Sequence, residues 1–325
     1  MLNGTDLVKL DFEGNLLWCC PHDYGFWGSP VHLKDNWLVC ASSDNKVHLI
    51  DQAGKIIRTT NLPTSVSTEI LVSSSGDLWF GMGAAECAVT RIDPNGDIAY
   101  TQYVARDQGL RHPLTMAGKG NLWAATDQGL VCLNARSGKI VLWKNAEKDG
   151  FRCISGALLC SNELLVVTVT PEHSCFVTRV AIDGTVVAQY PLPPLLRAKL
   201  LSASRGGIWL VGSTVSPWEP PLDSDQTFIA CLTENESPEI VTKVEGQRAI
   251  EATLDSDGTL WVGTYTYNDD DDSESGELLL YKNPTVPYAK WTPDPPTGVG
   301  VPVFSSNGNG VVATSKALVG FSLVE

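Results

Sequence analysis

Residues 112–146 read HPLTMAGKGNLWAATDQGLVCLNARSGKIVLWKNA and contain one complete structural unit. Apolar and polar residues alternate along HPLTMA, GNLWAAT, GLVCLNA and KIVLWKN, which is the pattern of half-buried β-strands. Short segments that contain glycine separate the stretches, as in β-hairpins. The sequence therefore predicts four short antiparallel strands in succession. No segment of the chain shows a sustained helical periodicity.

The same unit recurs along the whole chain. A Gly-Xaa-Leu/Ile-Trp phrase ends at Trp79, Trp123, Trp209 and Trp261, and a degenerate copy occupies 162–165. Turn glycines recur in step with it at Gly14, Gly54, Gly96, Gly138 and Gly184. Four strands in about 40 to 45 residues are typical of one β-propeller blade. Because the four tryptophans share one register of the second strand, we interpret them as packing between blades.

Counting the units predicts seven blades in a single all-β propeller domain, 1–325. Their first strands are expected to begin near Pro30, Thr68, His112, Ile154, Lys199, Ile250 and Val301. The chain opens with an outer strand pair and closes with an inner pair, so the N- and C-terminal strands are expected to share the last blade and close the ring, which removes free sheet edges. The tail 317–322, ALVGFS, also has the pattern of a third strand and competes with 6–10, so six or eight blades stay open.

Two stretches resemble repeats of known propeller families. Residues 76–98, GDLWFGMGAAECAVTRIDPNGDI, resemble the blade of virginiamycin B lyase-like and gluconolactonase/NHL-type propellers. Residues 28–55, GSPVHLKDNWLVCASSDNKVHLIDQAGK, are similar to the repeat of quinoprotein (PQQ-like) propellers. The resemblances imply the fold, whereas one propeller architecture hosts many functions. The resemblance implies that a quinoprotein dehydrogenase would carry a disulfide between adjacent cysteines in a loop. Cys19 and Cys20 lie instead on a predicted outer strand, which disfavours PQQ binding, so no cofactor is predicted.

Composition excludes several classes of function. The 325 residues carry a formal net charge of -14, and nucleic-acid binding requires Lys and Arg, so a nucleic-acid partner is not expected. No run of about 18 apolar residues is present, so no membrane-spanning helix is predicted. The first residues lack a basic stretch followed by an apolar block, and the nine cysteines are not arranged in metal-binding pairs. We therefore expect reduced thiols and a cytoplasmic location.

Four arginines stand at one equivalent position in successive units. Each lies 12 or 13 residues before the Trp-equivalent position, in the loop that enters an innermost strand: Arg111, Arg152, Arg197 and Arg248. Such loops converge on one face of a propeller. Clustered guanidinium groups repel one another unless acids or a bound anion neutralise them, and their fork suits carboxylate or phosphate. The pattern predicts a pocket for an anionic small molecule or an acidic peptide segment. The alternative is that each arginine pairs with a local acid: Asp107, Asp149, Glu245 or Glu251.

Four further residues near the starts of inner strands are candidates for catalysis: His112, Lys199, Glu69 and Glu251. A histidine titrates near neutral pH and suits general base catalysis. A desolvated lysine binds an oxyanion or acts as a nucleophile, and the glutamates suit acid, base or metal-ligand roles. Structural hydrogen bonds are the alternative for each of them.

Aromatic residues supply a second set of candidate contacts. Tyr24 and Trp27 lie in an aromatic loop and are expected to clamp a flat ligand or peptide, or, together with Phe26, to plug the channel. Trp218 is a candidate anchor for a partner protein. It lies in the insertion 213–226, and a second insertion spans 268–277; both are expected to join a second strand to a third.

Metal binding is not predicted from the pattern of histidines, because all five are scattered without metal-ligand spacing: His22, His32, His48, His112 and His173. The acidic run 269–272 lacks the glycine and spacing of a calcium loop, although calcium takes oxygen ligands, and a solvated loop is the favoured interpretation.

Three functions follow as hypotheses. The first is a binding module that captures an anionic ligand or a partner segment at an arginine-lined channel mouth. The second is a lyase or isomerase that anchors a substrate carboxylate on the arginines, with His112 or Glu251 transferring a proton. The third is a structural scaffold. Because no complete catalytic constellation can be assembled, the sequence favours the binding module.

Overall fold

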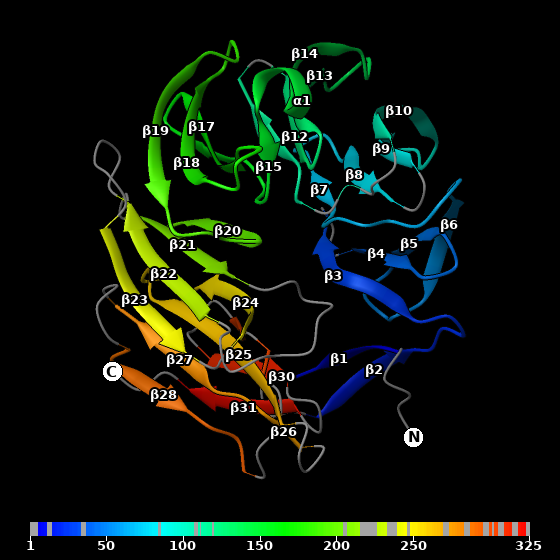
Figure 1. Ribbon diagram of the computed structural model, residues 1–325. Coiled ribbons are helices and arrows are strands. Elements are labelled where there is room, and N and C mark those ends of the chain that lie inside the picture. Colours follow the sequence, from blue (N-terminus) through cyan, green and yellow to red (C-terminus); the bar gives the residue numbers. More distant parts are fainter. Residues whose placement is uncertain are drawn as a thin grey trace. The chain divides into compact units, whose positions relative to one another are not determined.

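The computed structural model describes residues 6–322 except 12–14, 34–36, 84–85, 107–109, 111, 119, 204–206, 215–225, 233–238, 246–247, 269–272, 283–286, 295–298, 301, 305–308 and 314–317. Nearly all of the regular secondary structure in the described chain is β-strand (Figure 1). It divides into two compact units, Met1–Leu164 with Ala181–Thr185, and Leu165–Val180 with Val186–Glu325. Among the described residues, no helix has the length and apolar character needed to cross a membrane.

The first half of the chain forms small antiparallel sheets in which successive strands are neighbours. A two-stranded sheet contains β1 (Leu7–Leu10) and β2 (Leu16–Cys20). The next three sheets have four strands each: β3 (Phe26–His32), β4 (Leu38–Ser42), β5 (Lys46–Ile50) and β6 (Ile56–Asn61); β7 (Leu71–Val72), β8 (Leu78–Met82), β9 (Glu86–Ile92) and β10 (Ile98–Arg106); β11 (Thr115–Ala117), β12 (Asn121–Thr126), β13 (Gly129–Asn134) and β14 (Ile140–Asn145).

The later sheets repeat this organisation. One contains β15 (Arg152–Cys153), β17 (Glu163–Val169), β18 (Cys175–Ala181) and β19 (Val186–Leu192), with β16 (Leu158–Cys160) paired to β17. The next contains β20 (Arg197–Ser202), β21 (Ile208–Ser213), β22 (Gln226–Leu232) and β23 (Glu239–Glu245). The last two contain β24 (Arg248–Leu254), β25 (Leu260–Asn268), β27 (Leu278–Tyr281) and β28 (Ala289–Trp291), with β26 (Ser273–Ser275) paired to β25, and then β29 (Val303–Phe304), β30 (Asn309–Ala313) and β31 (Leu318–Ser322).

The four strands predicted within 112–146 are confirmed as β11, β12, β13 and β14, hydrogen-bonded in that order. The connections that carry the two insertions are also confirmed, since β21 leads to β22 and β25 leads to β26 and β27. One short helix is present among the described residues, α1 (Ala146–Asp149), which is too short to show a helical period in the sequence. The Asn145 side chain accepts hydrogen bonds from the backbone N–H groups of Glu147 and Lys148, which caps this single turn.

The turn glycines identified in the sequence have a packing role. A Cβ atom at Gly54 would lie 2.6 Å from Cδ2 of Trp18, and one at Gly138 would lie 2.6 Å from Cδ2 of Tyr100. Both glycines have positive φ angles, 81° and 72°. An outer-strand side chain of one sheet thus lies directly over the glycine turn of the next sheet, a contact that any side chain at the glycine would block.

The N-terminal hairpin of β1 and β2 makes the same kind of contact. Trp18 lies on β2 and covers Gly54 in the same way that Tyr100 on β10 covers Gly138. Trp18 also packs against a buried cluster with Cys40 and Ile50. The contact favours an outer strand pair at the start of the chain, but this stays a prediction, because β31 takes the third-strand position for which 6–10 competes. Cys20 is buried and Cys19 is half-buried, as expected for adjacent residues on one strand.

At the other end of the chain, the stretch ALVGFS contributes β31, the third strand of the sheet β29-β30-β31. The interpretation of this tail as a third strand is confirmed. That the N- and C-terminal strands share one blade stays a prediction, as does the single domain 1–325.

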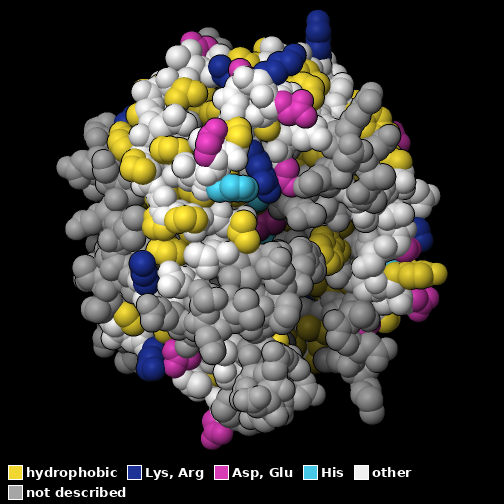
Figure 2. All heavy atoms as spheres, viewed as in Figure 1, with side chains coloured by type: hydrophobic (Ala, Val, Ile, Leu, Met, Phe, Trp, Pro, Cys, Tyr) yellow, Lys and Arg dark blue, Asp and Glu magenta, His cyan; other side chains and the backbone are white. Residues whose placement is uncertain are grey.

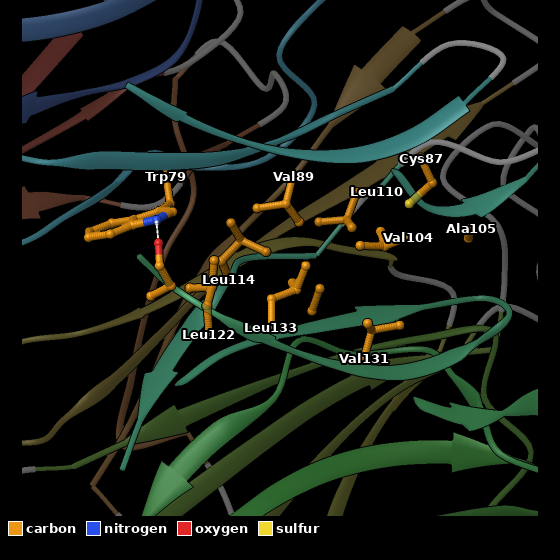
Figure 3. Close-up of a cluster of buried hydrophobic side chains, with 12 residues drawn as sticks. Trp79, Cys87, Val89, Val104, Ala105, Leu110, Leu114, Leu122, Val131 and Leu133 are labelled. Atoms are coloured by element: carbon orange, nitrogen blue, oxygen red, sulfur yellow. Dashed lines mark hydrogen bonds between the residues drawn. The ribbon is translucent and has the colours of Figure 1, made fainter. Parts of the chain in front are cut away.

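Three of the four repeated tryptophans pack between blades, as predicted, and the fourth, Trp123, is buried. Trp79 on β8 lies in a buried cluster with Leu122 and Leu133 of the following blade, and its indole N–H donates to the carbonyl of Ala135 at 3.2 Å (Figure 3). Trp209 packs in the same way against Leu260 and other residues of the sheet that follows it, and Trp261 packs against Phe304. Large apolar side chains at one register therefore build the core between sheets.

A buried ion pair supports the Trp79 contact. The Nε and Nη2 atoms of Arg91 donate to Asp77 Oδ1 at 3.0 and 2.7 Å, and Nη1 donates to the carbonyl of Arg136 in the next blade at 2.8 Å. Burial favours a higher pKa for Asp77, but hydrogen bonds from Ser75 and Arg91 outweigh it and hold this pKa below its ordinary value.

Acid is expected to weaken this network. A carboxyl whose pKa is lower in the folded chain stabilises the fold above its ordinary pKa, and this contribution is lost as the pH falls through the folded-state value. The melting temperatures of wild type and Asp77→Asn, measured from about pH 7 to pH 3, are therefore expected to differ most near neutral pH and to converge in acid, between about pH 5 and pH 3. Parallel curves over the whole range would contradict this role for Asp77.

Candidate functional site

The predicted arginines are described to different extents. Arg152 lies on β15 and is exposed, and Arg197 lies on β20 and is half-buried. Arg248 lies on β24 opposite Tyr265, but its side chain is outside the described residues, and so is Arg111. A ring of four arginines therefore stays a prediction.

A pocket does form around one of these arginines. It lies between the innermost strands of two successive blades, β20 and β24, against β21, with an empty volume of about 290 Å³ that is partly open to solvent. That figure includes open solvent; the cavity itself has a volume of about 30 Å³, well below that of small-molecule pockets. Its polar lining consists of Arg197, Lys199, Ser213 and Glu251, and its apolar lining of Ala198, Val211, Gly212 and Ala252. The structure thus brings together three of the residues that the sequence singled out.

Two of the candidate catalytic residues are paired with each other in this pocket. Lys199 Nζ donates to Glu251 Oε1 at 2.9 Å, and the two side chains are 37% and 48% exposed. An ion pair with this exposure contributes on the order of 1 kcal/mol or less to stability, so its partners can exchange at little cost. The lining therefore holds two cationic side chains and one anionic side chain.

The other two candidate catalytic residues lie outside this pocket lining. His112 is half-buried in the segment before β11, and Glu69 is exposed in the segment before β7. Lys199 and Glu251 belong to the second compact unit, whereas His112 and Glu69 belong to the first. A catalytic role for any of the four stays a prediction.

The aromatic candidates are exposed where they are described. Tyr24 is 65% exposed and Trp27 is 53% exposed, whereas Phe26 packs against the cluster of Cys40 and Ile50. Trp218 and the acidic run 269–272 lie outside the described residues. Whether the aromatic loop clamps a ligand or plugs a channel is not decided by these contacts, so both interpretations stay predictions.

Sequence reasoning missed one cluster of functional side chains. His22 and His48, which show no metal-ligand spacing in the sequence, lie close together in the fold, with ring centroids 4.9 Å apart. Asp44 lies beside them, with Oδ1 at 3.9 Å from His22 Nε2. The three residues come from the β2–β3 connection, the β4–β5 turn and β5, and the potential metal-ligating atoms lie within 4.8 Å of one another.

The pKa shifts of His48 and Asp44 favour the protonation states in which these side chains bind metal ions. Burial and the nearby His22 lower the pKa of His48, so its imidazole is neutral at neutral pH. Burial favours a higher pKa for Asp44, but hydrogen bonds from Lys46 and Ser42 lower it to about 2, which keeps this carboxyl ionised. A hint of the cluster is present in the sequence, since His48 interrupts the apolar strand KVHLI just after the turn that carries Asp44.

Charges are mixed on the face of the molecule that Figure 2 shows. Among the described residues that Figure 2 displays, Lys and Arg side chains are interspersed with Asp and Glu. The nine cysteines, all among the described residues, form no disulfide bond.

Comparisons with known proteins agree on the architecture. No family model matches the chain, and no curated protein does. The chain is similar to the crystal structure of BamB from Moraxella catarrhalis, with a TM-score of 0.66 and 11% identity over 94% of this chain and 88% of BamB. The fold is a β-propeller. The chain is also similar to the crystal structure of the computationally designed protein Ika8, with a TM-score of 0.65 and 10% identity over 99% of this chain and 95% of Ika8.

At these identities the similarity shows the fold alone. BamB is a PQQ-like β-propeller, so the resemblance of residues 28–55 to PQQ-like repeats is supported at the level of the repeat fold. Neither structure bears on the resemblance to virginiamycin B lyase-like propellers, which stays a prediction.

Proposed function

We propose that the protein is a binding module that captures an acidic segment of a partner protein at the pocket between β20 and β24. The observation that carries the proposal is the lining itself. Arg197 and Lys199, two residues apart on an innermost strand, face a space in which Glu251 is the only acidic residue among the described lining. In a chain with a formal net charge of -14, a pocket with more cationic than anionic side chains attracts anions selectively.

The mode of capture is an exchange of partners. A carboxylate of the incoming segment displaces Glu251 from Lys199, and the exposure of this ion pair makes the exchange inexpensive. The guanidinium of Arg197 adds charge-assisted hydrogen bonds, for which its planar fork is suited. The apolar atoms of Val211 and Ala252 line the same space and pack against the stem of an aspartate or glutamate side chain.

A labelled hexaglutamate peptide tests the proposal by fluorescence anisotropy at low salt. Arg197→Ala and Lys199→Ala are each expected to weaken binding about tenfold or more, because a hydrogen bond to a charged group contributes about 1.5 to 3 kcal/mol. Glu251→Gln is expected to tighten binding, because it removes the competitor for Lys199.

Matched controls exist on an outer strand of the same unit. Lys290 Nζ donates to Glu277 Oε1 at the same distance of 2.9 Å. Lys290→Ala and Glu277→Gln change the net charge of the protein as Lys199→Ala and Glu251→Gln do, and they are expected to leave binding unchanged. If the control variants and the pocket variants have equal effects, the peptide responds to net charge alone and the proposed site is wrong.

A further inference from the structure

The cluster of His22, Asp44 and His48 has the composition and arrangement of a metal site. Two imidazoles and one carboxylate converge from three different segments, with potential ligand atoms within 4.8 Å of one another. Zinc is bound by histidine nitrogen and carboxylate oxygen at about 2.0 to 2.2 Å, so ligand atoms on one tetrahedral ion lie roughly 3.4 Å apart. The 3.9 Å separation of His22 Nε2 and Asp44 Oδ1 is close to this value. A shift of the β2–β3 connection, which carries His22, would reduce it to the distance that a bound ion requires.

Hydrogen bonds around the cluster orient two of the three ligands. His48 Nδ1 lies 3.0 Å from Thr59 Oγ1, which can accept the Nδ1 proton and leave Nε2 as the ligating atom. Asp44 Oδ2 accepts from Lys46 Nζ at 2.5 Å, which leaves Oδ1 directed toward the histidines. Metal-ligating side chains are commonly fixed in this way by a second layer of hydrogen bonds.

The hydroxyl of Ser42 lies between two of the potential metal-ligating atoms. Its Oγ lies 2.5 Å from Asp44 Oδ1 and 2.9 Å from His48 Nε2, so the hydroxyl at present links two of the ligating atoms. An ion bonded to both atoms replaces these hydrogen bonds, and Ser42 is placed to serve as a further, neutral ligand.

The third ligand is the adjustable one. His22 Nδ1 accepts from the backbone N–H of Tyr24 at 3.3 Å, a long hydrogen bond. Ligation through Nε2 moves the ring proton to Nδ1 and gives up this bond. The side chains of His22 and Asp44 are each 11% exposed, whereas His48 is buried, so an ion enters from the side of His22 and Asp44.

We propose that His22, Asp44 and His48 bind a divalent transition-metal ion of the zinc type. Two imidazole ligands select zinc, cobalt, nickel or copper over magnesium and calcium, which prefer oxygen ligands alone. Three protein ligands leave a fourth position for Ser42, water or an anionic group of a bound molecule. The ion ties the entry connection of an innermost strand, which carries the exposed Tyr24, to the β4–β5 turn.

The test is a titration of the chelator-treated, full-length protein with Co²⁺, followed by its visible d–d absorption and by competition with Zn²⁺. Wild type is expected to bind one equivalent, and Zn²⁺ is expected to raise its melting temperature. His22→Gln and Asp44→Asn are each expected to weaken binding at least tenfold and to remove the thermal shift. His32→Gln replaces an exposed histidine of the neighbouring strand and is expected to bind as wild type does.

Three results would overturn the proposal. One is the absence of Co²⁺ binding by wild type, and another is equal binding by wild type, His22→Gln and Asp44→Asn. The third is a near-ultraviolet thiolate-to-cobalt absorption or a sulfur shell in X-ray absorption, which would assign the ion to cysteines. Melting curves of the metal-free variants separate a loss of ligands from a loss of folding. His22→Gln is the safer variant, because it gives up a long hydrogen bond from Tyr24, whereas Asp44→Asn disturbs those from Lys46 and Ser42.

Discussion

Gly129→Ala is expected to destabilise the protein by more than about 3 kcal/mol, which is among the larger effects of single substitutions. Gly129 begins β13 with a φ of 131°, a conformation that residues with a Cβ atom rarely adopt. A Cβ atom there would lie 1.8 Å from the carbonyl oxygen of Lys144 on the neighbouring strand. Because the obstacle is backbone, relief requires that β13 and β14 separate.

The control for this prediction is Gly120→Ala. Gly120 also has a positive φ, 81°, but a Cβ atom there would meet nothing within 4 Å. This variant carries the backbone strain without the clash and is expected to cost only about 1 to 2 kcal/mol. Urea unfolding followed by circular dichroism measures both. Equal midpoints for the two variants would show that the contact with Lys144 is not what excludes a side chain at Gly129.

Trp79→Ala is expected to destabilise the protein by about 3 to 5 kcal/mol, the range for large-to-small changes of buried aromatic residues. Trp79 is 5% exposed and fills the space between two blades, against Leu122 and Leu133. The substitution also leaves the carbonyl of Ala135 without the indole donor, although the Tyr100 hydroxyl donates to it as well. The lost packing is therefore the larger part of the expected effect.

Two variants separate packing from other causes. Trp79→Phe keeps most of the apolar volume and loses the indole N–H, and is expected to cost less than half as much as Trp79→Ala. Trp143→Ala removes a tryptophan that is 41% exposed on the outer strand β14, and is expected to have a small effect. Thermal unfolding measures the series, and an effect of Trp143→Ala as large as that of Trp79→Ala would argue against packing between blades as the role of the repeated tryptophan.

Much of the fold is predictable from local sequence patterns. Alternation along residues 112–146 predicted β11 to β14, and the recurrence of tryptophan at one register predicted the packing of Trp79, Trp209 and Trp261. These features depend on residues within a few positions of one another or on a repeat that is visible by inspection. The capped turn α1 was missed because four residues are too few to show a helical period.

The candidate sites were only partly predictable. Arg197, Lys199 and Glu251 were identified because they recur near the starts of inner strands, but the pairing of Lys199 with Glu251 depends on the placement of two successive sheets. His22 and His48 show no spacing that suggests a shared site. The register of the β4–β5 hairpin and the path of the β2–β3 connection bring them together with Asp44.

The sequence by itself determined the strands, their order within each blade, the turn glycines and the propeller fold, because each is encoded by short-range alternation and by repetition. Only the tertiary structure decided which polar side chains meet. The position of a residue in a strand decides which face of the sheet its side chain occupies. The side chain that it meets there belongs to a different segment of the chain, and no local sequence pattern shows that the two are close. The mixed lining of the pocket at Lys199 and the cluster at His48 therefore became visible only when the sheets were packed.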